Sequence, residues 1–331
     1  MTENRNFKRR VRARAAKTGE SYTTARLHLR DAEATGALRQ AKSLRLAVVQ
    51  SAYLDDPRAP AALRHAGEGI RQLMRQAHRA GARVVHFPEG ATCFPNKRIM
   101  SSIGPRDIGP SDWHRFEWAV LREELDAIRM LARELGLWTV LGSVHKLTEP
   151  HRPHNSLYVI SDKGTIATRY DERMLSNTKI SFMYTPGTIP LTFEVDGIRF
   201  GCALGIECHF PEIFLEYERL NVDCVLFSTS GGALANDLAF AAEVQGHASS
   251  NRYWASFAVL AQPGLTAPSG IVAPDGQWVT RCVGDGASMA IADIGNDPDD
   301  PARPWRRQAR GGIYDPHVVS DDPRSSRRDM F

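Results

Sequence analysis

The sequence has 331 residues, of which 42% are hydrophobic and 24% are charged, and it carries a formal net charge of +4. A chain of this length and composition buries a sizeable core, and large α/β sandwiches of this size often form one domain. Charged or turn residues interrupt every apolar stretch before the roughly 18 residues that a membrane-spanning helix requires. The sequence therefore predicts a soluble protein with no membrane partner.

The N-terminal segment is strongly basic. Residues 1–44 hold eleven Lys and Arg residues against four acidic residues, whereas the rest of the chain holds 31 basic and 34 acidic residues. No apolar core follows this segment, so it lacks the pattern of a secretory signal, and a cytoplasmic location is the expectation. Helical patterns at 7–17 and 22–34 favour a solvated leader or a helix docked on a neighbouring subunit. Binding of nucleic acid through this segment is the alternative.

The number and spacing of the cysteines indicate whether disulfides or a zinc site are expected. They are odd in number, scattered and without a C-x-x-C pair, which argues against a disulfide framework and against a structural zinc site. We predict reduced thiols, and no cofactor or resident metal is predicted. The five are Cys93, Cys202, Cys208, Cys224 and Cys282.

Strand and helix patterns alternate along the body of the chain, as is typical of α/β proteins. Turn residues at 162–164 predict a hairpin between 155–161 and 165–170. A helix is expected from Pro211, and the last 35 residues, rich in Pro, Arg and Asp, are expected to follow an irregular course over a surface. Apolar and β-branched runs predict the other strands at 44–50, 83–88, 138–144, 197–204, 223–229, 253–260 and 268–273, and apolar spacing predicts helices at 61–80, 113–136 and 234–251.

Several motifs follow one another in a recognisable order. They are VVHFPEG at 84–90, RYDERML at 169–175, YTPG at 184–187, GIRFGCALGIECHFPE at 197–212 and SGIVAPDGQWV at 269–279, with ARPWRRQARGGIYDP at 302–316. In order and spacing they resemble the nitrilase, or carbon–nitrogen hydrolase, superfamily over about residues 44–320. The resemblance implies a four-layer αββα sandwich and a homo-oligomer. Residues 1–43 would then be an N-terminal extension and residues 321–331 a flexible tail.

Members of that superfamily typically use a Glu as general base, a Lys to stabilise the oxyanion and a Cys thiolate as nucleophile, acting on amides, nitriles or N-carbamoyl compounds. The resemblance gives Glu89 the place of the base. Glu172 stands in the lysine's place, and Gly205 stands in the cysteine's place. The segment 174–187, where the family often has a second Glu, contains no acid. Because glycine offers no thiol, ordinary nitrilase catalysis through position 205 is excluded.

The residues around these positions leave several interpretations open. Carboxylates of Glu89, Glu172 and Glu207 in one cleft would raise the pKa of one of them. Such a group could activate water or hold a divalent cation or a polyamine-like ligand, or Glu172 could simply pair with a base. Cys208 is the one replacement nucleophile to test, although free cysteine more often packs as a small hydrophobe. Lys179 could replace the missing ammonium, but a surface position is expected.

Three functional hypotheses follow. The first is an enzyme that transforms a C–N bond of a small amide-like, carbamoyl-like or amine-bearing molecule, with Glu89 as base and with Glu172, Glu207 or Cys208 in altered roles. The second is a catalytically inactive ligand-binding or regulatory protein that keeps the fold for its pocket or its assembly surface. The third and weaker one gives the main role to residues 1–44 as a tether to nucleic acid.

Overall fold

The computed structural model describes residues 42–231 and 238–326 without interruption, together with residue 329 and residues 8, 9, 11–13, 15, 16, 22, 23 and 26. The chain divides into two units, Lys42–Asn296 and the combination of Met1–Ala41 with Asp297–Phe331. The described N-terminal residues are helical, and the rest of the two predicted N-terminal helices lies outside the described residues. In the C-terminal segment, α7 (Ala302–Arg310), η4 (Asp315–His317) and α8 (Pro323–Ser326) replace the irregular course that was expected.

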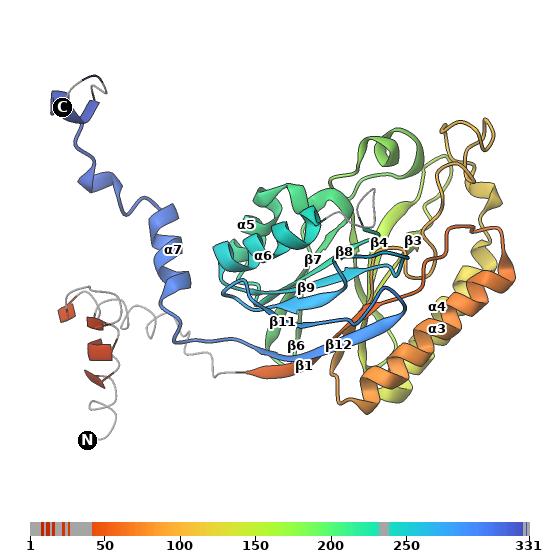
Figure 1. Ribbon diagram of the computed structural model, residues 1–331, viewed down its shortest axis with the longest axis horizontal. Helices are drawn as coiled ribbons and strands as arrows, with labels where there is room; N and C mark the ends of the chain where they lie inside the picture. The colour runs from red at the N-terminus through yellow and green to blue at the C-terminus, as the bar shows by residue number, and fades with distance from the viewer. Residues whose placement is uncertain are drawn as a thin grey trace. The chain divides into compact units, whose positions relative to one another are not determined.

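The larger unit contains two six-stranded sheets (Figure 1). Each sheet has three parallel strands at its centre and antiparallel strands toward its edges. The first sheet has the order β12 (Ser288–Gly295), β1 (Ser43–Gln50), β2 (Val84–His86), β3 (Trp138–His145), β4 (His154–Ile160) and β5 (Ile166–Asp171). The second has the order β11 (Trp278–Arg281), β10 (Gly270–Val272), β9 (Trp254–Val259), β8 (Cys224–Thr229), β7 (Ile198–Leu204) and β6 (Thr192–Val195).

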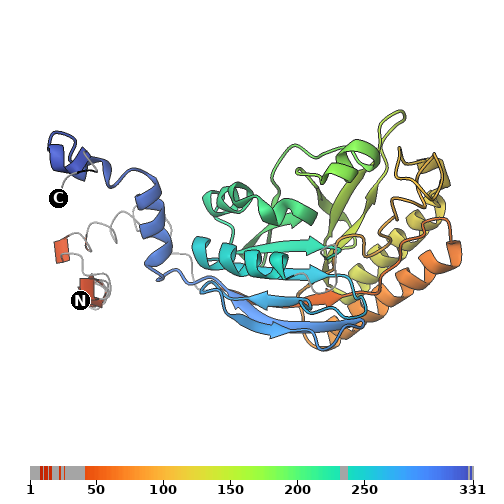
Figure 2. The same cartoon turned by 45° about the horizontal axis from the view of Figure 1, so that its top comes forward.

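Helices cover the outer face of each sheet. The pair α3 (Pro60–Arg79) and α4 (Trp118–Leu135) lies on the first sheet, and α5 (Pro211–Arg219) and α6 (Ala239–Asn251) lie on the second (Figures 1 and 2). Period-2 alternation sends successive side chains of a strand to opposite faces. On β1, Leu46 and Val48 enter the core between the sheets, whereas Ala47 and Val49 pack under the helices. The predicted αββα sandwich is therefore confirmed.

The predicted elements of the body largely coincide with the observed ones. The predicted helix at 113–136 is broken into η1 (Trp113–Arg115) and α4, and the helix predicted at 234–251 is described only from Ala239. The sequence did not predict β6, β12 or the π-helical segment η2 (Lys179–Met183). In the described parts of the chain, no helix is both long and apolar enough to cross a membrane.

The strand ends bring the candidate residues to one region. Glu89 follows β2, Gly205 follows β7 and Ser230 follows β8, so all three lie just beyond the carboxyl ends of central parallel strands. In open α/β sheets this is the edge where functional groups gather. Glu172 joins them from the end of β5.

Candidate functional site

Four polar side chains form a buried cluster at this edge. Glu89 and Glu172 are each 1% exposed and Lys179 is 8% exposed. The Lys179 ammonium donates to Glu89 Oε1 and to the two oxygens of Glu172, at 2.9 and 2.7 Å. The Asn155 amide donates to Glu89 Oε1 at 2.8 Å and to Glu172 Oε2 at 2.6 Å. The expectation of a surface position for Lys179 is therefore wrong, because two buried carboxylates hold it inside.

Glu89 is positioned by backbone groups on both sides. The Ser230 N–H donates to Glu89 Oε2 at 2.8 Å. On the other side, β3 approaches the FPEG turn so closely that a Cβ on Gly142 would lie 2.0 Å from the Pro88 carbonyl oxygen. A glycine is required at such an approach. The carboxylate expected to act as the family's base therefore has a fixed place with three donors around it: Ser230, Asn155 and Lys179.

A buried histidine joins the two sheets beneath Glu89. His86 Nδ1 lies 2.9 Å from the Ser256 hydroxyl and Nε2 lies 2.7 Å from the Ser228 hydroxyl. Ser228 in turn donates to the Phe87 carbonyl at 3.1 Å. Burial lowers the pKa of His86 to about 3, so the imidazole is neutral. These contacts satisfy the polar groups of the inter-sheet core and fix the strand that leads to Glu89.

Lys179 reaches the carboxylates from an irregular segment. It opens the π-helical turn η2, in which the Tyr184 N–H donates to the Lys179 carbonyl at 2.9 Å. Such turns are rare and frequently occur at functional sites. Lys179 comes from the segment 174–187, where the resemblance led us to expect an acid, and Glu172 stands where it led us to expect a lysine. Relative to that expectation, the lysine and the glutamate have exchanged positions, and the ammonium and the carboxylate are still in contact.

The space beside Gly205 is already filled. Gly205 has a φ of +56°, a conformation that glycine adopts readily and other residues rarely do. A Cβ at this position would lie 2.2 Å from Glu172 Oε1 and 2.8 Å from Lys179 Nζ. Both distances are shorter than a van der Waals contact. The Glu172 carboxylate therefore occupies the volume that a cysteine side chain would need.

Burial and mutual charge perturb this cluster. Burial, with the neighbouring Glu89 and Glu207 carboxylates, raises the pKa of Glu172 to about 8, although the Lys179 ammonium opposes the shift. Burial alone would lower the pKa of Lys179, but the Glu172 and Glu89 carboxylates raise it above its ordinary value. Lys179 therefore stays charged at neutral pH, and Glu172 takes up a proton more readily than an ordinary glutamate does.

Glu207 lies near enough to Glu172 for its charge to act on that carboxylate, but its hydrogen-bond partners lie outside the cluster. It is fully buried and accepts hydrogen bonds from the Tyr170 hydroxyl at 2.9 and 2.7 Å, and from the N–H groups of Arg173 at 2.6 Å, Met174 at 3.2 Å and Leu204 at 2.7 Å. Burial raises its pKa, and these donors oppose the shift. Its two oxygens fasten the chain after β5 to the end of β7. The contacts therefore support a positioning role.

The structure does not bring Cys208 into the cluster. Its side chain is fully buried in an apolar group that includes Phe214 and Phe240, and its thiol donates to the Phe240 carbonyl at 3.7 Å. Burial raises the pKa of this thiol well above its ordinary value, whereas a nucleophilic cysteine needs a lowered one. Burial likewise raises the pKa of Cys93, Cys202, Cys224 and Cys282.

A small cavity meets the cluster at Lys179. Its volume is about 190 Å³. Lys179 and Phe94 form part of its wall, and the Lys179 ammonium lies 6.0 Å from the centroid of the Phe94 ring. The remaining wall consists of Tyr53, Pro95, Asn96, Lys97, Ser176, Thr178, Met183 and Tyr184. A molecule in this cavity would meet an ammonium group and aromatic surfaces, and neither carboxylate of the cluster lines it.

Within the described residues, no three His, Cys, Asp or Glu side chains are arranged to hold a metal ion. Between Glu89 and Glu172, where a cation was one of the possibilities considered, the Lys179 ammonium takes that place. The positive charge that two buried carboxylates require is therefore supplied by the chain itself.

The model of the carbon–nitrogen hydrolase family matches residues 45–297. This match covers most of the sequence and all twelve strands of the two described sheets except the first two residues of β1. The chain belongs to the carbon–nitrogen hydrolase family. The larger unit ends at Asn296, close to the end of the match, and extension of the domain to residue 320 stays a prediction.

Two curated relatives from Mycobacterium tuberculosis, Hydrolase MT0498 and Hydrolase Rv0480c, are each 27% identical to the chain over 198 residues. The similarity covers 57% of this chain and 62% of each relative, so the chain spans less than two thirds of their length. Among solved structures, a cysteine-to-alanine mutant of the Nesterenkonia AN1 amidase from the nitrilase superfamily has a TM-score of 0.65 and 17% identity, covering 83% of this chain and 97% of the amidase. A double mutant in complex with acrylamide has a TM-score of 0.65, 16% identity, and coverages of 83% and 100%. This likeness establishes the shared fold.

Proposed function

We propose that this chain binds a small amide-like molecule at the family site without forming a covalent acyl–thiol intermediate. The observation that carries the proposal is the exchange of charges around Gly205. Glu172 fills the volume beside Gly205 that a nucleophile there would need, while Lys179 lines the adjacent cavity. The site thus keeps a donor for a carbonyl oxygen and lacks the group that would attack the carbonyl carbon.

The ligand class follows from the wall of the cavity. An ammonium group has three N–H donors, and the partners of Lys179 are two carboxylates. Because these carboxylates present three oxygens to the ammonium, a ligand carbonyl oxygen would take the place of one of the two Glu172 contacts, and Phe94 and Tyr184 offer apolar surface beside it. An amine-bearing cation would be repelled by the same ammonium, so an amide-like ligand is favoured over an amine-bearing one. The volume of about 190 Å³ suits a molecule of a few heavy atoms.

Solved structures of an amidase with the same fold illustrate the difference between non-covalent binding and covalent reaction. One solved structure shows a mutant of the Nesterenkonia amidase in complex with butyramide, and another shows covalent addition of the acetamide moiety of fluoroacetamide at the active-site cysteine. By motif, Gly205 of this chain corresponds to the active-site cysteine of the amidase. We therefore propose that this chain binds a molecule such as butyramide but forms no covalent adduct at this position.

Direct hydrolysis by water is a second candidate, and the raised pKa of Glu172, about 8, favours it. A group with that pKa holds a proton at neutral pH and could give it to a leaving amine, while Glu89 takes a proton from the attacking water. The carbonyl carbon would gain the water oxygen and lose its nitrogen. Against this candidate, both carboxylates are engaged by Lys179 and Asn155 and neither lines the cavity.

The test measures binding and turnover together. Butyramide is titrated into the full chain by calorimetry, and ammonia release from butyramide and acetamide is followed in parallel. We expect binding without ammonia release. The Glu172→Gln, Lys179→Met double variant removes the ammonium together with one of its two carboxyl partners, and we expect it to bind butyramide at least tenfold more weakly. Lys163→Met, in the exposed turn between β4 and β5, is the matched control and should bind normally.

Other results separate the candidates. Ammonia release that is lost in Glu89→Gln would establish hydrolysis by water and overturn the proposal. Absence of both binding and turnover would also overturn it. Unchanged binding by the folded double variant would show that Lys179 is not the donor.

A further inference from the structure

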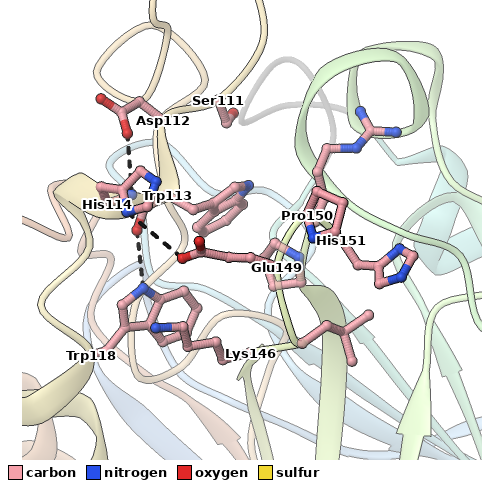
Figure 3. A pocket seen from close by; sticks show the side chains of 12 residues that line it. Ser111, Asp112, Trp113, His114, Trp118, Lys146, Glu149, Pro150 and His151 are labelled. Carbon is pink, nitrogen blue, oxygen red and sulfur yellow. Dashed lines mark hydrogen bonds and ion pairs between the residues drawn. The ribbon is translucent and has the colours of Figure 1, made fainter.

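A second and larger cavity lies on the far side of the segment that carries Lys179. Its volume is about 520 Å³, within the range of roughly 300–1,000 Å³ found for small-molecule sites. It opens between the segment that precedes α4 and the loop that follows β3 (Figure 3). Its lining is Ser111, Asp112, Trp113, His114, Trp118, Lys146, Leu147, Glu149, Pro150, His151, Arg152 and Pro153.

Two tryptophans form a rigid wall of this cavity. The rings of Trp113 and Trp118 lie 6.0 Å apart, and Trp118 stacks on Phe116 at 4.4 Å. Both indole N–H groups are already satisfied, by the Met183 carbonyl at 3.0 Å and by the Trp113 carbonyl at 3.0 Å. The wall is therefore held in place and offers a ligand mainly aromatic carbon surface.

Two cations, Lys146 and Arg152, and two acids, Asp112 and Glu149, belong to the lining of the cavity. Lys146 lies over the Trp118 ring, its nitrogen 5.4 Å from the ring centroid (Figure 3). Arg152 donates to the Ile180 carbonyl at 2.8 Å. In the described part of the chain, neither side chain has a carboxylate within ion-pair distance.

One of the two acids of the cavity is neutralised by a neighbouring cation. Asp112 pairs with Arg115 at 3.1 Å and also accepts the His114 N–H at 3.1 Å. Glu149 lies 3.9 Å from the His114 imidazole. Lys146 and Arg152 thus outnumber Glu149, the one acid of the lining without a Lys or Arg partner among the described residues, and this balance favours an anionic ligand over a cationic one.

We propose that this cavity is a second ligand site that binds a planar aromatic carboxylate, with its ring against Trp113 and Trp118 and its carboxylate on Lys146. The ring gains apolar and stacking contact, and the carboxylate gains a charge-assisted hydrogen bond over an aromatic surface. None of the residues that line the smaller cavity takes part in this site, so its test is independent of the test for amide binding.

The experiment uses 2-naphthoate as the probe. Saturation-transfer NMR and quenching of tryptophan fluorescence are measured on the full chain, with 2-naphthamide and cyclohexanecarboxylate as matched compounds that lack the charge and the aromatic ring. We expect 2-naphthoate to bind at least tenfold more tightly than either compound, and Lys146→Met to weaken it about tenfold. Lys163→Met should leave binding unchanged. Because Lys146 is exposed, its replacement keeps the fold, which the unfolding midpoint verifies.

Three outcomes would overturn the proposal. One is absence of 2-naphthoate binding at millimolar concentration. Another is equal binding of 2-naphthamide, which would remove the carboxylate from the recognition. The third is unchanged binding by both Lys146→Met and Trp118→Leu, which would move the site elsewhere on the protein.

Discussion

The Glu172 carboxylate lies where a side chain on Gly205 would begin, since a Cβ at that glycine would lie 2.2 Å from Glu172 Oε1. The two positions are therefore interdependent. A larger side chain at position 205 and the Glu172 carboxylate would compete for the same volume, so a change at one position is expected to affect the other. This relationship makes the site testable by paired substitutions.

Gly205→Ala is expected to destabilise the fold by about 2–4 kcal/mol, since it combines a left-handed backbone conformation with steric overlap. Glu172→Ala removes the closer of the two overlaps, the one with Glu172 Oε1, and we expect the double variant to show a coupling energy of about 1–2 kcal/mol. Urea unfolding of the two single variants and the double variant measures this. Strict additivity would show that the two side-chain positions are independent.

Glu207→Gln tests the positioning role of Glu207. The amide keeps the shape but turns one of two accepting oxygens into a donor that faces N–H groups of the chain, such as those of Leu204 and Arg173. We expect a loss of about 2–3 kcal/mol in unfolding free energy, the range for hydrogen bonds to a charged group. Glu216→Gln, which weakens a half-exposed pair with Arg173, is the matched control and should cost less than about 1 kcal/mol. Equal losses would contradict the assignment.

The pKa of Glu172 predicts a pH dependence of stability. Its folded value of about 8 lies above its ordinary value of 4.5, so the folded state binds more protons between these two pH values. The free energy of unfolding should therefore fall as the pH rises from about 4.5 to about 8, by at most about 1.4 kcal/mol per pH unit, and the contribution is absent above that window. The difference between the wild-type and Glu172→Gln curves isolates this group. Parallel curves would contradict the shift.

The sequence predicted the carboxylate positions because each belongs to a local motif. Glu89 follows a strand in FPEG, and counting from fixed neighbours placed Glu172 and Gly205. Lys179 was misjudged because its burial depends on Glu172, seven residues away, and on Glu89, 90 residues away, in other elements. A lone lysine in an apolar stretch gives no local sign of such partners.

Asn155 was missed for a similar reason. It lies near the start of β4, where alternation predicts only that a side chain faces one side of the sheet. That it donates to both Glu89 and Glu172 depends on the pairing of β4 with β3 and β5. The fold class follows from patterns along the chain, whereas the chemistry of the cluster follows from contacts between distant segments.

The last prediction concerns the segment that separates the two cavities. The Trp113 indole N–H donates to the Met183 carbonyl at 3.0 Å, at the end of the π-helical turn that begins with Lys179. Trp113→Phe leaves that carbonyl without its donor, while the hydrogen bonds from Ser111 to the Phe182 carbonyl and from Arg152 to the Ile180 carbonyl remain. We expect amide hydrogen exchange in residues 180–184 to accelerate about tenfold, a change of about 1.4 kcal/mol in local opening.

Trp254→Phe supplies the matched control for this prediction. It removes an equivalent hydrogen bond, from the Trp254 indole to the Gly295 carbonyl at 2.7 Å, in a different part of the fold. A general loss of stability would accelerate exchange in residues 180–184 in both variants, whereas a local effect appears only in Trp113→Phe. Unchanged exchange in Trp113→Phe would mean that the Trp113 hydrogen bond does not stabilise the turn that begins with Lys179. The tryptophans of the larger cavity would then not affect the stability of the smaller one.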